Sequence, residues 1–541
     1  MTTGAEASTV APSRRGRRAP LTYVLPSVAA AAAVVVPLIY VFVRALEGGA
    51  RGWAAAVFSP LSAELLLNTL LLVAGVLPLT LVLALPTAWL VARTDLPGRR
   101  VWGVLAALPL VFPSYLAAFT LVAFLGPRGL LQGWLAATLG DRSLGEIAYG
   151  YSGALIALGF FTYPYVYLLA VAALRKSDPA LEESARSLGA GAWRRFADVI
   201  VPQLVPSMRA GGLLVVLYTL SDFGVVSIVR YNTYTLGIYN AYRGLFDRTV
   251  AAALATVLIV LTLAFLALEV RLGRRSRPTR TRPSRPPAPL PLGRRWTPIA
   301  LAWLTGLCAV GVGIPAGTIA WWAVRAFRAD GIATWTAAAA SGSLGTSLAA
   351  ALIAVAFATP LALWAARHPS PLSRWIERIA FAGYALPGLV VALALVFFVT
   401  RALGFLYQTL ALLIAGYVIR FLPEAVAAMR SSVAALSPSF EDAARSLGER
   451  PAGILRTITI PLLRPGLLAG GGLVFLTAMK ELPATLILRP TGFDTLATRI
   501  WTAVSELFYA DAAVPSMLLV MLSAIPMYVL VIRPALAGGR S

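Results

Sequence analysis

Apolar residues in this chain come in long runs, and short segments rich in arginine, proline and glycine separate the runs. Each run has about 20 residues or more, which is the length that an α-helix needs to cross a bilayer. The runs are 21–43, 64–91, 102–125, 147–174, 203–229, 249–270, 298–324, 344–366, 376–400, 405–429, 462–488 and 513–533. This pattern predicts an all-α polytopic membrane protein with about twelve transmembrane helices in two repeated six-helix halves.

The composition supports the membrane class. Of the 541 residues, 59% are hydrophobic and 13% are charged, whereas a soluble domain has about 45–50% apolar and about 25% charged residues. The chain has one cysteine, Cys308, and one histidine, His368. A disulfide or a Cys/His metal cluster needs more of these residues, so the counts exclude an internal disulfide and a Cys-based or multi-His metal site. We expect no metal site, no catalytic residue and no cofactor bound by this chain.

The net charge of +23 is typical of a nucleic-acid-binding protein, but its distribution argues for a membrane role. Basic residues gather at the ends of the apolar runs. With the N-terminus in the cytoplasm, 32 of the 46 Lys and Arg lie on the cytoplasmic side, 12 lie opposite, and Arg420 and Lys480 lie inside spans. The cytoplasmic loops of a membrane protein carry an excess of Lys and Arg, so this count favours the chosen orientation. We therefore expect a multi-pass membrane protein with both termini in the cytoplasm, surrounded by lipid and without a nucleic-acid partner.

The two halves contain a repeated segment. Residues 178–206 and 437–465 align without a gap, 259 positions apart, and share ten identical residues. Each follows the fourth span of its half, so the repeat indicates a duplicated bundle, a common plan for transporters. We expect an N-terminal tail (1–20), a first domain (21–270), a disordered Arg- and Pro-rich cytoplasmic linker (271–296) and a second domain (297–541).

Within the repeated segment, apolar residues recur with helical spacing. The stripe is Leu181, Ala185 and Leu188 in the first copy, and Phe440, Ala444 and Leu447 in the second. Glu182 and Arg186 stand four residues apart, as do Glu441 and Arg445, which favours ion pairs on the exposed side of a helix. The pattern indicates a short amphipathic helix on the cytoplasmic surface in each half.

Glycine and proline mark the limits of this helix and of the next one. Gly189 and Gly448 follow the apolar stripes, where a left-handed residue ends a helix. Pro202 and Pro461 mark the start of the next span after a second short helix. A helix lying on lipid headgroups is one interpretation. We favour a docking element for a soluble partner, because lipid binding requires no fixed residue order in two places. Two elements imply two partner copies or a partner dimer.

The same segments resemble the coupling loop of ATP-binding-cassette (ABC) importer permeases. The matching residues are Glu183-Ser184-Ala185 with Gly189 and Pro202, and Asp442-Ala443-Ala444 with Gly448 and Pro461. Ser184 and Asp442 depart from the family pattern but preserve size or charge. The resemblance covers nearly the whole chain as two fused permease domains. It assigns ATPase coupling to Glu182, Glu183, Ala185, Gly189, Pro202, Glu441, Asp442, Ala444, Gly448 and Pro461. It also implies two copies of a cytoplasmic ABC ATPase, a periplasmic or lipid-anchored substrate-binding protein, and a location in the bacterial inner membrane.

A phosphate-binding loop of the type G-x-x-x-x-G-K-[ST] is missing from the sequence. The chain has two lysines, Lys176 and Lys480, and neither follows the required glycine. Without that loop, the chain has no cradle for the phosphates of ATP. We therefore expect that it is not an enzyme and that a partner subunit hydrolyses the ATP-Mg.

Charged residues inside membrane spans are candidates for function. The repeat places Ser221-Asp222-Phe223-Gly224 opposite Lys480-Glu481-Leu482-Pro483, toward the outer part of the fifth span of each half. Ser221, Asp222, Lys480 and Glu481 either line the transport pathway or lock the bundle through ion pairs. We expect Asp222 and Glu481 to face or flank the pseudo-symmetry axis. Lys480 should pair with a carboxylate or a carbonyl group.

These stretches also bear on the substrate. The SDFG sequence in the first half and KELPATLILRP in the second resemble the fused ferric-iron permeases, which implies ferric iron as the substrate. Thiamine, polyamine, sulfate and phosphonate remain alternatives within the same importer type. An ion-gradient-driven secondary transporter with 6+6 helices is a further alternative, but it would not need the repeated cytoplasmic helices.

Overall fold

The computed structural model describes residues 19–127, 129–139, 143–244, 247–273, 289–329 and 334–534. Most of the predicted N-terminal tail (1–20) and residues 274–288 of the predicted linker lie outside the described residues.

Helices form nearly all of the first half. They are α1 (Leu21–Leu46), α2 (Gly49–Val57), α3 (Pro60–Arg93), α4 (Arg99–Leu105), η1 (Leu108–Val111), α5 (Ser114–Leu125), α6 (Leu130–Leu139), η2 (Ser143–Ala148), α7 (Gly150–Arg175), α8 (Pro179–Ser187), α9 (Ala192–Arg195), η3 (Phe196–Ile200), α10 (Val201–Ser221), α11 (Gly224–Ile228), α12 (Tyr234–Arg243) and α13 (Arg248–Gly273). The long helix α3 begins four residues before the predicted run 64–91, because Ser59 accepts a hydrogen bond from the Ser62 amide and Pro60 occupies the first turn.

The second half repeats this order. Its helices are α14 (Gly293–Cys308), η4 (Ala309–Gly313), α15 (Ile314–Ala329), α16 (Thr334–Arg367), α17 (Pro371–Ala385), α18 (Gly388–Ala402), η5 (Gly404–Leu406), α19 (Leu410–Ala435), α20 (Ser439–Ser446), α21 (Pro451–Ile454), η6 (Leu455–Thr459), α22 (Ile460–Leu462), α23 (Arg464–Met479), α24 (Pro483–Leu488), α25 (Leu496–Ser505), α26 (Tyr509–Met527) and η7 (Tyr528–Ile532). Helices α3 and α16 both have 34 residues.

The all-α polytopic class is confirmed. In the described residues, ten helices are long and apolar enough to cross a membrane, or up to twelve if each of two sharply bent pairs is one span. Several contain proline inside the helix, for example Pro78 and Pro86 in α3. Membrane helices tolerate such residues because neighbouring helices and local adjustments satisfy the freed backbone groups.

Four predicted spans are not single helices, and here the sequence interpretation was wrong. The span predicted at 102–125 is interrupted between α4 and α5, and the one at 376–400 bends by 108° between α17 and α18. Pro113 and Pro387 stand directly before α5 and α18, and proline drives the residue before it away from helical geometry. The spans predicted at 203–229 and 462–488 end early, because α10 and α23 stop at Ser221 and Met479.

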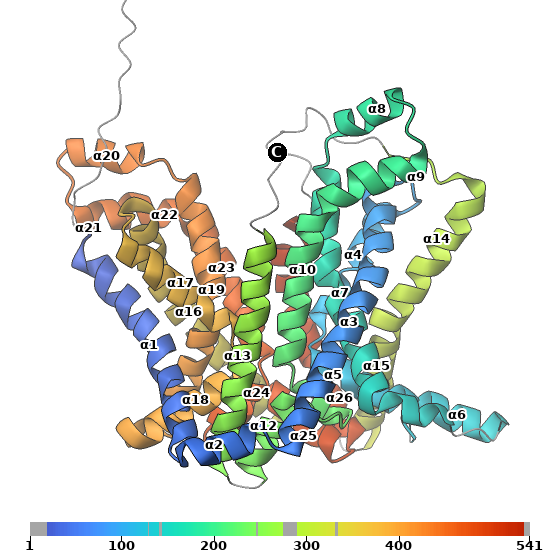
Figure 1. Ribbon diagram of the computed structural model, residues 1–541, viewed down its shortest axis with the longest axis horizontal. Coiled ribbons are helices and arrows are strands. Elements are labelled where there is room, and N and C mark those ends of the chain that lie inside the picture. Colours follow the sequence, from blue (N-terminus) through green and yellow to red (C-terminus); the bar gives the residue numbers. More distant parts are fainter. Residues whose placement is uncertain are drawn as a thin grey trace, which may run out of the picture.

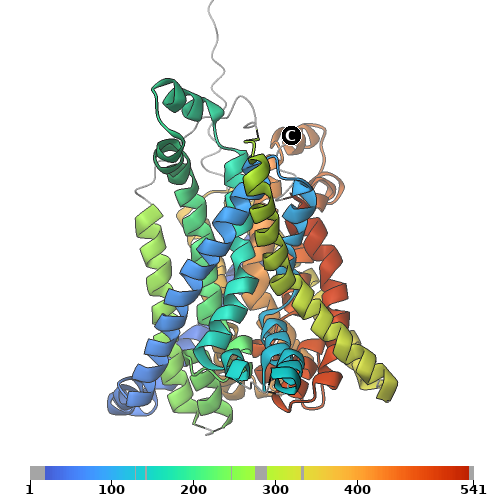
Figure 2. The same ribbon diagram turned by 90° about the vertical axis from the view of Figure 1, so that its right-hand side faces the viewer.

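The first helix of each half packs against the other half. Helix α1 contacts α13 of its own half and α16, α17 and α18 of the second half. In the same way, α15 contacts α26 of its own half and α5 of the first half. Figure 1 shows α1 on the side of α16 and α17, and α14 beside α3. In Figure 2 the rod of α14 and α15 runs diagonally across the first half. The exchange joins the halves into one bundle.

The two ends of the bundle carry different elements. Helices α8 and α9 project at one end together with α20 and α21, and we call this the α8/α20 end. Helices α12 and α25 lie at the opposite end, which we call the α12/α25 end. The repeated segment of each half therefore lies on the same side of the molecule.

Candidate functional site

The repeated segments form the expected short helices with a glycine after each. Helix α8 is capped by Asp178, whose side chain accepts from the Ala180 amide. Gly189 and Gly448 have φ of 81° and 84°. Both glycines therefore adopt the left-handed conformation that the sequence predicts, in which a side chain would be strained. The chain then runs through α9 and η3, or through α21, η6 and α22, into the next long helix.

A leucine at the tip of each segment lies open on the surface. Leu188 is 87% exposed and Leu447 is 85% exposed. Leu181 and Phe440, on the preceding turns, are exposed as well, whereas Ala444 is buried. The predicted apolar stripe thus faces outward at its tip, where a large apolar side chain gains free energy if a partner covers it.

The acidic residues of these helices divide into two groups. Glu183 and Asp442 are exposed, and Asp442 accepts a 2.6 Å hydrogen bond from Arg445. Glu182 and Glu441 instead face the body of the protein. Glu182 does not make the expected pair with Arg186 but bonds Arg93 at 2.7 Å, and the expectation of an exposed Glu182–Arg186 pair was wrong.

In the second copy, the expected pair is present but the carboxylate is not exposed. Arg445 lies 3.5 Å from Glu441, whose residue surface is only 5% exposed. Of the remaining predicted residues, Ala185 and Pro461 are half-buried, whereas Pro202 is exposed.

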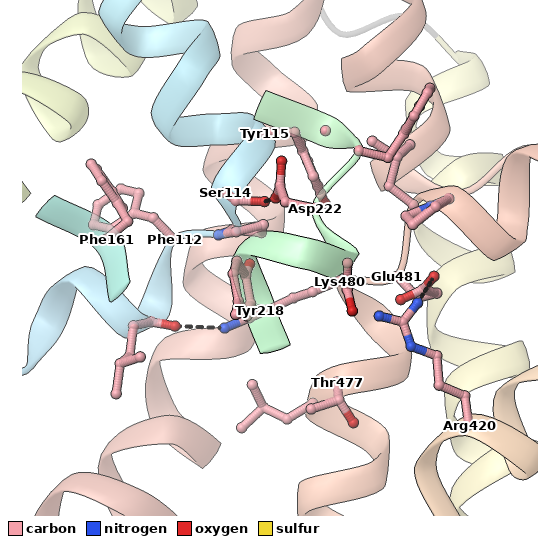
Figure 3. A pocket seen from close by; sticks show the side chains of 18 of the residues that line it. Phe112, Ser114, Tyr115, Phe161, Tyr218, Asp222, Arg420, Thr477, Lys480 and Glu481 are labelled. Carbon is pink, nitrogen blue, oxygen red and sulfur yellow. Dashed lines mark hydrogen bonds and ion pairs between the residues drawn. The ribbon is translucent and has the colours of Figure 1, made fainter. Parts of the chain in front are cut away.

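The helix breaks of both halves meet around a cavity of about 180 Å³. Ser221, Asp222, Lys480 and Glu481 all line it, together with residues of α5, α7 and α19. Figure 3 shows the two carboxylates entering this region from different halves. The structure therefore brings together all four residues that the sequence singled out inside the spans.

Each carboxylate caps the short helix that follows its break. The Asp222 Oδ1 atom accepts from the Val225 amide at 2.8 Å, and the Glu481 Oε1 atom accepts from the Ala484 amide at 3.0 Å. The capping contact spans three residues in both halves, so the pseudo-symmetry extends to individual atoms. This capping gives a physical reason why the spans stop here, since a side-chain acceptor at a helix start satisfies amides that have no helical partner.

The two carboxylates differ in their other partners. Asp222 accepts a 2.5 Å hydrogen bond from the Ser114 hydroxyl. Glu481 forms an ion pair with Arg420. Gly388 begins α18 as Ser114 begins α5, and a Cβ atom at Gly388 would overlap the Arg420 guanidinium. The second half thus has a glycine where the first half has a serine, and the Arg420 guanidinium occupies the space that a side chain at Gly388 would need.

The lysine connects the two halves. The Lys480 Nζ donates to the carbonyl of Leu110 at 3.0 Å, which joins the end of α23 to η1 of the first half. The expected carbonyl partner is therefore present. Both interpretations of the charged residues retain support, because the groups line a cavity and also bind residues of neighbouring helices.

Sequence reasoning missed Arg420, which lines this cavity, and Glu424, which binds the lining residue Thr477. Arg420 was recognised as a charge inside a span but was not placed at the site, and Glu424 was overlooked. Glu424 accepts a 3.0 Å hydrogen bond from Thr477. At the repeat offset of 259, these positions correspond to Phe161 and Tyr165 in the first half. A comparison of all charged positions between the repeats would have found them.

Comparison with known proteins identifies the family. The pattern of the binding-protein-dependent transport system inner membrane components matches residues 80–278 and 358–533, once in each half. The first match includes α8 and Asp222, and the second includes α20 and Glu481. The chain belongs to this family. It is accordingly a multi-pass inner-membrane permease of a binding-protein-dependent importer, with two permease domains fused in one chain.

Individual relatives agree with this assignment. The Fe(3+)-transport system permease protein FbpB 2 of Haemophilus influenzae is 32% identical over 95% of this chain and 98% of its own length. The sulfate transport system permease protein CysT of Escherichia coli is 30% identical over 36% of this chain and 72% of its own length. The molybdenum transport system permease protein ModB of Escherichia coli is 30% identical over 35% of this chain and 84% of its own.

Proposed function

We propose that this chain is the permease of an ATP-driven importer for ferric iron, and that two copies of a separate ABC ATPase bind at α8 and α20. A periplasmic or lipid-anchored binding protein delivers the ion at the α12/α25 end. Closure of the ATPase dimer then moves the two halves, and the ion passes between them. The chain hydrolyses no ATP and holds no cofactor, since ATP and Mg²⁺ act in the partner subunit.

The observation that carries the proposal is the duplicated docking helix with an exposed tip. Leu188 and Leu447 occupy equivalent positions beside left-handed glycines and are both more than four-fifths exposed. Burying one leucine side chain gains about 1.5–3 kcal/mol. A partner with one apolar cleft per copy would cover both tips, so the pseudo-symmetry favours two ATPase copies.

The orientation follows from the charge distribution. The α8/α20 end carries the excess of basic residues, and a cytoplasmic location for it obeys the positive-inside rule. Both termini and the linker (271–296) are then cytoplasmic. The first permease domain comprises 21–270 and the second 297–541, and each contributes one docking segment, 178–206 and 437–465.

Ferric iron as the substrate is supported by similarity and by the chemistry of the cavity. The relative that matches nearly the whole chain is named as an Fe(3+) permease. Asp222 and Glu481 provide oxygen atoms at the cavity wall, and a hard cation prefers oxygen ligands. During transport, these carboxylates would exchange their present partners for the passing ion.

An oxyanion is the second candidate substrate. Arg420 and Lys480 also line the cavity, and both can bind an oxyanion through charge-assisted hydrogen bonds. Relatives named for sulfate and molybdenum support this alternative, although they match only about a third of the chain.

A transport assay in proteoliposomes tests the proposal. The permease is reconstituted with the ATPase and binding protein that copurify with it from the native membrane, and uptake of radiolabelled ferric iron is compared with uptake of sulfate and molybdate. We expect iron accumulation only when ATP and Mg²⁺ are supplied on the ATPase side. Uptake of an oxyanion without iron would select the second candidate. Uptake driven by an ion gradient without ATP would refute the importer assignment.

A further inference from the structure

An arginine at the end of α3 fastens the docking helix of the first half. Arg93 is the last residue of α3 and is 2% exposed. One guanidinium nitrogen donates to the Ser177 hydroxyl at 2.7 Å and another to the Glu182 carboxylate at 2.7 Å. Ser177 precedes α8, and Glu182 lies on its first turn. The guanidinium also lies over the Trp89 ring, 5.5 Å from its centre.

The second half has the same arrangement. Arg367 is the last residue of α16 and corresponds to Arg93, because α3 and α16 have equal lengths. It donates to the Leu436 carbonyl at 3.1 Å and lies 3.5 Å from the Glu441 carboxylate. Leu436 and Glu441 stand 259 residues after Ser177 and Glu182. In both halves, an arginine at the end of the long helix therefore contacts a residue that precedes the docking helix and the glutamate on that helix.

The docking helices make few other contacts with the long helices. Besides the arginine contacts, α8 packs mainly on α9 and η3, and α20 packs on α21 and η6, which all belong to the same repeated segment. By contrast, α3 packs along α7 and α10, and α16 packs along α19 and α23. Those four helices carry or end at residues that line the cavity. In each half, the arginine thus joins the docking helix to a long helix, α3 or α16. That long helix packs along the helices that line the cavity.

The chemistry suits a mechanical connection. Arginine presents its donors in a planar fork, so one guanidinium can hold two acceptors at a fixed separation, whereas lysine cannot. The contacts are buried, and screening by salt is therefore weak. In the first half, the Leu290 amide also donates to the Arg93 carbonyl at 2.7 Å, so the end of the linker fixes the same point.

We propose that Arg93 and Arg367 are positioning residues that transmit displacement of the docking helices to α3 and α16. This inference rests on the proposed function. In this role the arginines are not needed to bind the ATPase, since the exposed tips Leu188 and Leu447 lie on the outer side of the segments. They are needed to convert movement of the bound segment into movement of the spans.

The test uses the full complex in proteoliposomes. The variants are Arg93→Gln, Arg367→Gln and the double variant. The matched controls are Arg100→Gln and Arg374→Gln, which replace exposed arginines in the first turns of the following helices, α4 and α17. We expect the double variant to copurify with the ATPase but to transport about tenfold less substrate per ATP hydrolysed, a typical size for the coupling of two sites. The controls should match the parent. Parental transport per ATP in the double variant, or loss of ATPase binding, would overturn the proposal.

A cross-link provides a rescue that a merely stabilising role would not predict. Arg93→Cys and Ser177→Cys are combined in a Cys308→Ser background, and a bifunctional thiol reagent about as long as an arginine side chain joins them. We expect poor coupling before cross-linking and recovery afterwards. Failure to recover would contradict the mechanical role. If the parent complex itself shows no ATP-dependent uptake, the proposed function is wrong. If the parent transports and only the result for the arginine variants differs from the expected one, the role of Arg93 and Arg367 is wrong.

Discussion

Gly388→Ala is the substitution that most directly probes the charged wall of the cavity. Gly388 begins α18, and a Cβ atom there would overlap the guanidinium of Arg420 and would also lie only 2.7 Å from the Glu481 Oε1 atom. Because Arg420 pairs with Glu481, we expect the new side chain to displace the arginine and to leave the carboxylate without its cationic partner. The serine at the equivalent position of the first half causes no such conflict, because it donates to Asp222.

The expected cost follows from the burial of the pair. The side chains of Arg420 and Glu481 are 19% and 6% exposed, and loss of one partner of a buried pair costs about 3–5 kcal/mol. Replacing glycine by alanine in a helix recovers up to about 1 kcal/mol. We therefore expect a net destabilisation of roughly 2–4 kcal/mol.

Thermal unfolding in detergent, followed by size-exclusion chromatography, measures this effect. Gly345→Ala in α16 is the matched control, because a Cβ atom there meets nothing within 4 Å. The decisive comparison is a double-mutant cycle with Arg420→Met. If the arginine causes most of the conflict, Gly388→Ala should cost clearly less in the Arg420→Met background than in the parent. Equal stability of Gly388→Ala and the parent would refute the reasoning, as would an unchanged cost when Arg420 is absent.

Three further predictions concern coupling and passage. Gly189→Val and Gly448→Val, made in turn, should uncouple transport from ATP hydrolysis while membrane insertion persists, because a left-handed residue with a Cβ costs roughly 1–2 kcal/mol. Normal uptake with normal ATPase stimulation in both variants would contradict the docking role. Reversing the charge of Glu183 and Asp442 together should weaken copurification of the ATPase, and unchanged copurification and uptake would exclude a direct role for these carboxylates. Asp222→Asn should reduce uptake while assembly persists if the group lines the route, but should lower thermal stability if it locks the bundle; normal values of both would dismiss both roles.

The sequence alone determined the membrane class, the duplication and the position of the docking helices. Each of these depends on local patterns. An apolar run of bilayer length specifies a span wherever it occurs, and the left-handed glycines follow from the spacing between the helix and the next segment. The family resemblance rests on the same short segments, which is why it could be recognised before the structure was considered.

Only the tertiary structure decided which charges meet, and it showed where the spans break. Arg93 and Glu182 are separated by 89 positions, and Arg420 and Glu481 by 61, so no local period relates them. The interpretation of 203–229 as one span failed because Asp222 caps a new helix instead of continuing the old one. Likewise, helix spacing suggested Arg186 as the partner of Glu182, but an arginine from another helix reaches the carboxylate from the buried side. Charges in a low-dielectric interior select partners through packing, and packing is a property of the assembled bundle.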